Sequence, residues 1–135
     1  MRLDHIGVAV RSLERARKFY ESLGLRVTGT ETLAGEKVRV AMLPLGETRI
    51  ELMEPTADDS PIARFIEKRG EGLHHIAIEV RELDRHVRGL EAAGIRTIPL
   101  RAEVGAGGQR YAFLHPASCG GVLVELVEAS AENVR

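Results

Sequence analysis

The chain has 135 residues, of which 44% are hydrophobic and 29% are charged, and its formal net charge is −1. This length allows one ordinary domain or two small units with a shared core, and the balanced charge gives no reason to expect nucleic acid or an anionic membrane as a partner. No apolar run reaches the roughly 18 residues that a membrane span requires. Arg2 and Asp4 interrupt any signal-peptide pattern, and the lone Cys119 fits a reducing compartment, so we expect a cytoplasmic protein.

The first half of the chain predicts a strand, a helix and then three more strands. Residues Leu3–Val10 alternate with the period of a strand. Ser12 can then cap a helix whose apolar residues recur at helical spacing until Gly24, a residue suited to a left-handed helix end. Turn residues separate the three strands expected next, which are Leu25–Leu33, Lys37–Leu45 and Thr48–Met53.

A short linking helix and a second βαβββ segment follow. Ser60 as the cap, Pro61 at the first helical position and Gly70 at the end define the linking helix. The segments expected after it are the strand His74–Arg81, the helix Glu82–Ala93, and the strands Ile95–Leu100, Gln109–His115 and Gly121–Val127. We expect a single domain over residues 1–130, with module one at about 1–58, the linking helix at about 60–70, module two at about 73–130, and a frayed tail at 131–135.

The two predicted modules repeat one another. The segment LDHIGVAV near the N-terminus matches LHHIAIEV at the start of module two, and this match places His5 on His75. The end of each module matches as well, because IELMEP resembles VELVEA and so places Glu51 on Glu125. Each module therefore carries one histidine early and one glutamate late.

The strand period divides the residues of each module between two faces. In module one, Ile6, Val8 and Leu52 are placed to pack under a helix, whereas His5 and Glu51 share the opposite face. Two such sheets set side by side would enclose a cleft lined by those opposite faces, and binding sites favour such interfaces. We therefore predict an α+β fold in which two tandem βαβββ modules form a cupped mixed sheet around a cleft.

The residues that would line this cleft are potential metal ligands. Two of them, Glu51 and Glu125, lie in apolar strands, where a carboxylate is costly unless it is protonated or paired. A divalent cation shared with His5 and His75 is a further solution, and imidazole with carboxylate suits cobalt, nickel, manganese, iron or zinc. Zinc fits less well because it prefers fewer ligands. A single inward histidine is more often a hydrogen-bonded core residue, so the duplication is what favours ligation.

These residues and motifs resemble a known family. Paired βαβββ modules with the ligand pattern His, Glu, His, Glu resemble the vicinal oxygen chelate superfamily over essentially the whole chain. Within that superfamily, the segments DSPIARFIEKRGEGLHHIAIEV, VGAGG and FLHPASCGGVLVEL are similar to the methylmalonyl-CoA epimerase family. The resemblance implies a vicinal oxygen chelate fold and an epimerase that interconverts the 2R and 2S epimers of methylmalonyl-CoA, an acyl-CoA substrate.

The resemblance also implies a cofactor and an assembly. It implies a homodimer and a divalent metal held by His5, Glu51, His75 and Glu125, with cobalt favoured and nickel, manganese, zinc or magnesium as alternatives. Many members of the family have glutamine at the position of Glu51. The acid is therefore a departure towards the pattern of glyoxalase I.

Epimerisation needs acid–base groups beside the reacting carbon. Removing the proton at C2 places negative charge on the thioester oxygen, which a metal stabilises as a Lewis acid. We predict Glu51 and Glu125 as the acid–base residues and favour Glu51, with Glu79 as a further candidate. Some family members have a glutamate on the third strand of module one, and we place Arg39 near that position, where arginine cannot act as a base.

Substrate contacts are predicted at Gly107, Gly108 and His115. The glycine loop can offer backbone N–H groups to a carboxylate or close as a lid, and a simple flexible turn is the alternative. His115 ends a strand near the cleft, where packing and substrate contact are alternatives. Basic residues of the linking helix either meet CoA phosphates or form a solvated face; these residues are Arg64, Lys68 and Arg69.

Three other functions remain open on sequence alone. A lactoylglutathione lyase would use the same fold, metal and proton transfer on a different thiol adduct. A metal-free ligand-sequestering protein of the same fold would usually lack the four ligands. An extradiol dioxygenase needs two histidines and one carboxylate around ferrous iron, and the fourth ligand and the short chain argue against it.

Overall fold

The computed structural model describes residues 1–98 and 108–130 of the chain. The chain divides into two compact units. The N-terminal unit is His5–His74, and the C-terminal unit is His75–Arg135 together with Met1–Asp4. Within the described residues, no helix combines the length and the apolar character needed to cross a membrane.

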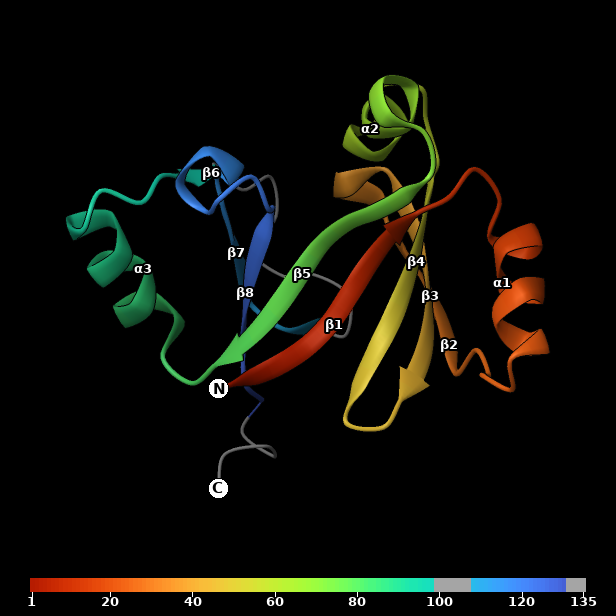
Figure 1. Cartoon of the computed structure of the whole chain (residues 1–135), viewed down its shortest axis with the longest axis horizontal. Coiled ribbons are helices and arrows are strands. Elements are labelled where there is room, and N and C mark those ends of the chain that lie inside the picture. Colours follow the sequence, from red (N-terminus) through yellow and green to blue (C-terminus); the bar gives the residue numbers. More distant parts are fainter. Residues whose placement is uncertain (99–107, 131–135) are drawn as a thin grey trace. The chain divides into compact units, whose positions relative to one another are not determined.

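The N-terminal unit contains a mixed sheet with the strand order β2-β3-β4-β1 (Figure 1). Strand β1 runs parallel to β4, whereas β3 is antiparallel to both β2 and β4. The elements of this part of the chain are β1 (Arg2–Ala9), α1 (Leu13–Ser22), β2 (Gly29–Leu33), β3 (Val38–Leu45), β4 (Thr48–Pro55) and α2 (Pro61–Arg69). The predicted order of one strand, one helix and three strands is confirmed, and so is the predicted linking helix.

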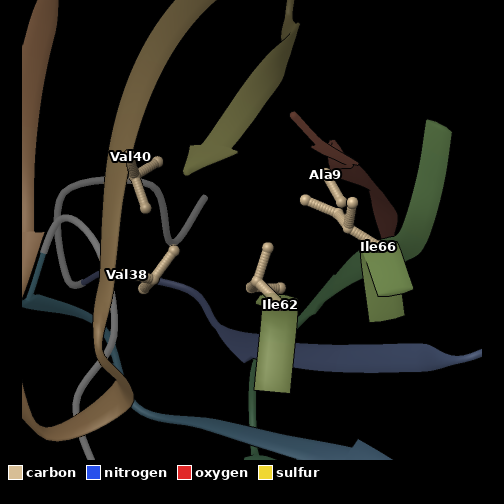
Figure 2. Close-up of a cluster of buried hydrophobic side chains, with 5 residues drawn as sticks. All are labelled: Ala9, Val38, Val40, Ile62 and Ile66. Carbon is tan, nitrogen blue, oxygen red and sulfur yellow. The ribbon is translucent and has the colours of Figure 1, made fainter. Parts of the chain in front are cut away.

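The strand period gives this sheet two faces, and each carries an apolar cluster packed against a helix. The cluster under α1 consists of Val10, Leu13, Ala41, Leu43 and Leu52. The cluster under α2 consists of Ala9, Val38, Val40, Ile62 and Ile66 (Figure 2). Burying one large aliphatic side chain stabilises a fold by about 1.5–3 kcal/mol, so both helices are held mainly by packing. As predicted, Val8 and Leu52 pack in the α1 cluster.

The helix ends follow the local sequence signals. The Ser12 hydroxyl accepts the Arg15 N–H at 3.2 Å, and the Ser60 hydroxyl accepts the Ile62 N–H at 3.1 Å. Gly24, with φ of 100°, ends α1 in the left-handed region that glycine adopts without steric cost. These predicted caps and this predicted helix end are therefore confirmed.

Two glutamates add helix caps that the sequence did not predict. Glu54 Oε2 on β4 accepts the backbone N–H of Leu13 at 2.8 Å, at the start of α1. In the C-terminal unit, Glu128 Oε2 accepts the backbone N–H of Leu83 at 3.2 Å. A carboxylate at this position satisfies a helix N–H that has no partner within the helix, and it complements the helix dipole. The repeat thus includes a capping glutamate near the end of each module.

The C-terminal unit repeats this plan with the strand order β5-β8-β7-β6. Strand β5 runs parallel to β8, and β7 is antiparallel to β8 and β6. Helix α3 covers a cluster of Val80, Leu83, Ala112, Leu114 and Leu126 on one face of the sheet. The elements are β5 (Gly72–Val80), α3 (Leu83–Ala92), β6 (Thr97–Ile98), β7 (Tyr111–Leu114) and β8 (Val124–Glu128).

Several predicted strands are shorter in the structure. Strand β2 begins at Gly29 rather than Leu25, because Leu25 and Val27 pack into the cluster under α1. Strand β8 begins at Val124 rather than Gly121, whose φ of 89° is incompatible with a strand. Strand β6 begins at Thr97 rather than Ile95, and β7 is shorter than its predicted range. The end of the strand predicted before the glycine loop lies outside the described residues, as does the predicted frayed tail.

Candidate functional site

A buried histidine–glutamate pair lies on the sheet of the N-terminal unit. His5 comes from β1 and Glu51 from the parallel neighbour β4, where Gly7 is the register partner of Glu51. His5 precedes Gly7 by two residues and so lies on the same face. Nδ1 of His5 is 3.3 Å from Oε2 of Glu51, and each residue is 4% exposed. The structure therefore brings together the two residues of module one that the sequence singled out.

Arg49 contacts the same carboxylate. Its Nε and Nη2 atoms lie 2.8 Å and 2.7 Å from Oε2 of Glu51. Arg49 precedes Glu51 by two residues on β4, so the strand period places both side chains on one face. A carboxylate this deeply buried is costly without a charged or hydrogen-bonding partner. The guanidinium supplies such a partner from the neighbouring position on the same face.

The C-terminal unit carries the equivalent pair. His75 lies on β5 and Glu125 on β8, and Nε2 of His75 is 3.2 Å from Oε1 of Glu125. The two residues are 5% and 8% exposed. The register partner of Glu125 is Ala77, two residues after His75. The Phe113 ring packs edge-on against the imidazole of His75, with the ring centroids 5.4 Å apart.

Each pair offers donor atoms of the kind that bind divalent metals. In each unit the histidine precedes the register partner of its glutamate by two residues, so the sequence repeat is also a repeat of strand register, although the contacting nitrogen is Nδ1 in His5 and Nε2 in His75. Neutral imidazole and carboxylate are common ligands of first-row divalent metals. The buried histidines and acids that lie in groups of three with potential metal-binding atoms include His5, Glu51, His75, Glu125 and also Asp4.

Strand β3 brings no carboxylate to the face that carries the N-terminal pair. Met42 is the register partner of Glu51, and Val40 lies two residues before Met42 on the same face. Arg39 lies on the opposite face, where its Nη2 is 3.2 Å from Oε1 of Glu54. The residue that β3 places on the face of the pair, near the expected family glutamate, is therefore a buried valine.

Glu79, the further candidate base, has an arginine partner. It lies on β5 on the same face as His75 and is 8% exposed. Arg2 contacts both of its carboxylate oxygens, with Nε 3.2 Å from Oε1 and Nη2 3.3 Å from Oε2. A bidentate arginine contact of this kind fixes the orientation of the carboxylate.

The predicted substrate contacts have different outcomes. Gly107 and most of the glycine loop lie outside the described residues, whereas Gly108 is exposed with φ of 76°. His115 is half-buried and caps the short turn that follows β7, because its Nδ1 accepts the Ala117 N–H at 3.0 Å. The three basic residues of α2 that the sequence singled out are exposed.

The remaining histidines have local partners. His74 packs edge-on against Phe65, with the ring centroids 4.9 Å apart. His86 lies on α3, where its Nδ1 is 2.9 Å from the carbonyl oxygen of Glu82. These contacts involve no residue of the two histidine–glutamate pairs.

Sequence reasoning missed the contacts of three residues. The sequence predictions assign no role in the site to Arg49, Arg2 or Asp4. Asp4 is 2% exposed. A charged residue two positions from a buried glutamate in an apolar strand is the signal that identifies Arg49. No such spacing identifies Arg2, because its partner Glu79 is distant in sequence.

Two surface carboxyls have lowered pKa values. A hydrogen bond from Lys37 lowers the pKa of Asp59, and the nearby charge of Lys37 adds to this effect. A hydrogen bond from Arg110 and its charge lower the pKa of Asp84. Both carboxyls are exposed, so these shifts report surface ion pairs rather than the chemistry of the histidine–glutamate pairs.

Comparisons with known proteins agree with this geometry. The family model of the Glyoxalase/Bleomycin resistance protein/Dioxygenase superfamily matches residues 4–113. The mitochondrial methylmalonyl-CoA epimerase of Bos taurus is 45% identical over 130 residues, which cover 95% of this chain and 74% of that protein.

Solved structures are similar over nearly the whole chain. A variant of the Streptomyces coelicolor methylmalonyl-CoA epimerase in complex with 2-nitronate-propionyl-CoA has a TM-score of 0.93 and 36% identity, covering 100% of this chain and 99% of that chain. A methylmalonyl-CoA epimerase in complex with methylmalonyl-CoA and NH4+ has a TM-score of 0.91 and 37% identity, covering 96% of this chain and 95% of that chain.

Proposed function

The chain belongs to the glyoxalase/bleomycin resistance protein/dioxygenase superfamily, and we propose that within this superfamily it catalyses the epimerisation of methylmalonyl-CoA. The observation that carries the proposal is the likeness to methylmalonyl-CoA epimerases over nearly the whole chain, one of them bound to methylmalonyl-CoA. The chain has the α+β vicinal oxygen chelate fold of these proteins. The reaction interconverts the 2R and 2S epimers of the substrate.

The fold and the buried histidine–glutamate pairs support a divalent metal cofactor. In our proposal its ligands are His5, Glu51, His75 and Glu125, and the equivalent register of the two pairs supports this choice. When bound, such a metal supplies Lewis-acid stabilisation of the charge that develops on the thioester oxygen. We favour cobalt, with nickel, manganese, zinc or magnesium as alternatives.

The chain's own carboxylates move the proton. A base takes the proton from C2, the electron pair of the C–H bond moves towards the thioester oxygen, and return of a proton to the opposite face gives the other epimer. We propose Glu51 and Glu125 for these steps, with Glu51 preferred. A general base has to lie within hydrogen-bond reach of the proton that it removes. Because both residues belong to the proposed ligand set, a substrate bound at the metal would lie next to them.

The remaining parts of the proposal concern substrate contacts, assembly and compartment. Gly107, Gly108 and His115 contact the substrate, and a single domain spans residues 1–130. The protein acts as a homodimer in the cytoplasm. The resemblance to the epimerase family supports the dimer, and the lone Cys119 supports a reducing compartment.

Two assays run in parallel test the proposed reaction. Metal-loaded protein is offered 2S-methylmalonyl-CoA with a coupled readout of the 2R epimer, and separately the methylglyoxal–glutathione adduct with a readout of lactoylglutathione. We expect turnover of the thioester and none of the adduct above the rate without protein. Turnover of the adduct alone would make the chain a lactoylglutathione lyase and overturn the proposal.

A further inference from the structure

We propose that Arg49 binds the free carboxylate of the substrate and so makes the site specific for 2-substituted malonyl thioesters. This inference rests on the proposed function, because it requires a substrate with a carboxylate beside its thioester. It gives Arg49 a task beyond its contact with Glu51. Three features support this role: the position of Arg49, the charges around it and the chemistry of its guanidinium group.

The position of Arg49 suits a contact with a ligand bound at Glu51. Both residues lie on one face of β4, and the Arg49 side chain is 22% exposed, whereas that of Glu51 is 5% exposed. The guanidinium thus links a deeply buried carboxylate to a more accessible position on the same face. A charged group that is partly accessible can meet a substrate without full loss of its own solvation.

The contact with Glu51 is compatible with metal ligation. Both Nε and Nη2 of Arg49 contact the same oxygen, Oε2. Nδ1 of His5 lies 3.3 Å from the same oxygen, so Oε1 is the Glu51 oxygen that would remain for a metal while Arg49 keeps its contact. A guanidinium has five N–H donors in a planar array, so one arginine can bind two carboxylates at once. Arginine–carboxylate contacts of this type are strong and selective for geometry.

The charges of the proposed site also call for such a group. The two negative charges of Glu51 and Glu125 balance a divalent cation, and Asp4, next to His5 in the chain, is a further buried acid. The substrate then brings its own carboxylate, and the negative charges already present disfavour its binding. The positive charge of Arg49 offsets part of this repulsion, and a thioester without the carboxylate would not gain from it.

The chain offers a matched control for the role of Arg49. Arg39 lies on the neighbouring strand β3 and pairs with Glu54, on the face of the sheet that α1 covers. Its removal takes the same charge from the same sheet without affecting the face of Glu51. Arg39→Ala therefore separates a general effect of charge from a local one.

The test compares two thioesters that differ only in the free carboxylate. Isothermal titration on Co²⁺-saturated protein measures the Kd of methylmalonyl-CoA and of propionyl-CoA for wild type, Arg49→Ala, Arg49→Lys and Arg39→Ala. The Co²⁺ affinity of each variant is measured separately. We expect Arg49→Ala to weaken methylmalonyl-CoA binding by about 10–100-fold, the range of a charge-assisted hydrogen bond. Propionyl-CoA binding should stay within about twofold of wild type, because that thioester has no carboxylate to lose.

The controls make each outcome decisive. Arg49→Lys keeps the charge and is expected to retain part of the preference for methylmalonyl-CoA, and it replaces Arg49→Ala if the alanine variant does not fold. Arg39→Ala is expected to match wild type with both thioesters. Equal weakening of both thioesters by Arg49→Ala, or no weakening of either, would overturn the inference, while wild-type turnover leaves the proposed function standing. A wild-type protein that does not epimerise methylmalonyl-CoA would overturn both.

Discussion

Nε2 of His75 lies 3.2 Å from Oε1 of Glu125, and the imidazole is held edge-on by Phe113. Both members of the pair are buried, and the register of β5 and β8 fixes their spacing. Ligands whose rotamers are already held by packing lose little conformational freedom when an ion binds. The pair in the C-terminal unit is therefore suited to ligation before any metal arrives.

Removing one of these proposed ligands should weaken metal binding strongly. For His75→Ala we expect the Co²⁺ affinity to fall by more than about 10–100-fold, the loss that follows removal of a group that only orients a ligand. Isothermal titration with Co²⁺ measures the change. His86→Ala is the control, because His86 lies on α3 and takes no part in the pair. Equal affinities of wild type and His75→Ala would exclude His75 as a ligand.

Exchange of Glu51 for glutamine separates proton transfer from ligation. An amide cannot accept the proton from C2, but its oxygen can still ligate a metal. For Glu51→Gln we expect the rate of deuterium incorporation at C2 of methylmalonyl-CoA to fall by about 10²–10⁴-fold, the usual contribution of a general base. Glu54→Gln, three residues along the same strand, is the control. An undiminished rate in Glu51→Gln would remove Glu51 as the base and leave the function standing.

The capping glutamates should contribute to stability rather than to catalysis. Glu54→Ala removes the acceptor for the Leu13 N–H at the start of α1, and we expect the free energy of unfolding to fall by about 0.5–2 kcal/mol. Glu54→Gln keeps an acceptor oxygen, so its loss should be smaller. Urea unfolding followed by circular dichroism provides the measurement. A Glu54→Ala variant as stable as wild type would show that this contact does not act as a cap.

The lowered pKa of Asp84 predicts a local pH dependence. The hydrogen bond and charge of Arg110 hold the pKa of this carboxyl below its usual value. The contribution of the pair to stability is therefore present above the usual pKa of aspartate and is lost as the pH falls through the lowered value. In Arg110→Ala the pKa of Asp84 should rise, as an NMR titration of its carboxyl carbon would detect. An unchanged pKa would contradict this assignment, and Arg85→Ala is the control.

Much of the fold follows from local sequence signals. Alternation and helical spacing predicted the order of elements in both units, and the Ser12 and Ser60 caps have the predicted hydrogen bonds. The limits of the strands were less predictable, because Leu25 and Val27 have a strand-like pattern but pack under α1 outside any strand. Burial under a helix and pairing in a sheet select the same apolar side chains, so the sequence pattern does not separate them.

The part of the candidate site that could be predicted from the sequence is the histidine–glutamate pair that occurs in both modules. A histidine and a glutamate at matching positions of two modules identified both pairs, because chance rarely produces such a match twice. Arg2 and Arg49 are not marked by the repeat. The Arg2–Glu79 contact joins residues 77 positions apart. Arg49 has no counterpart in the repeat, where Leu123 occupies the equivalent position.

The proposed metal-assisted epimerisation is tested most directly by proton exchange at C2 of the substrate, measured with and without the cation. Co²⁺-loaded protein and chelator-treated protein are incubated with methylmalonyl-CoA in D₂O, and deuterium at C2 is followed by mass spectrometry. We expect rapid incorporation by the loaded protein, loss of incorporation after chelation, and its return when Co²⁺ is restored. Incorporation that is equally fast after complete removal of the metal, or none by the fully loaded protein, would contradict the proposal.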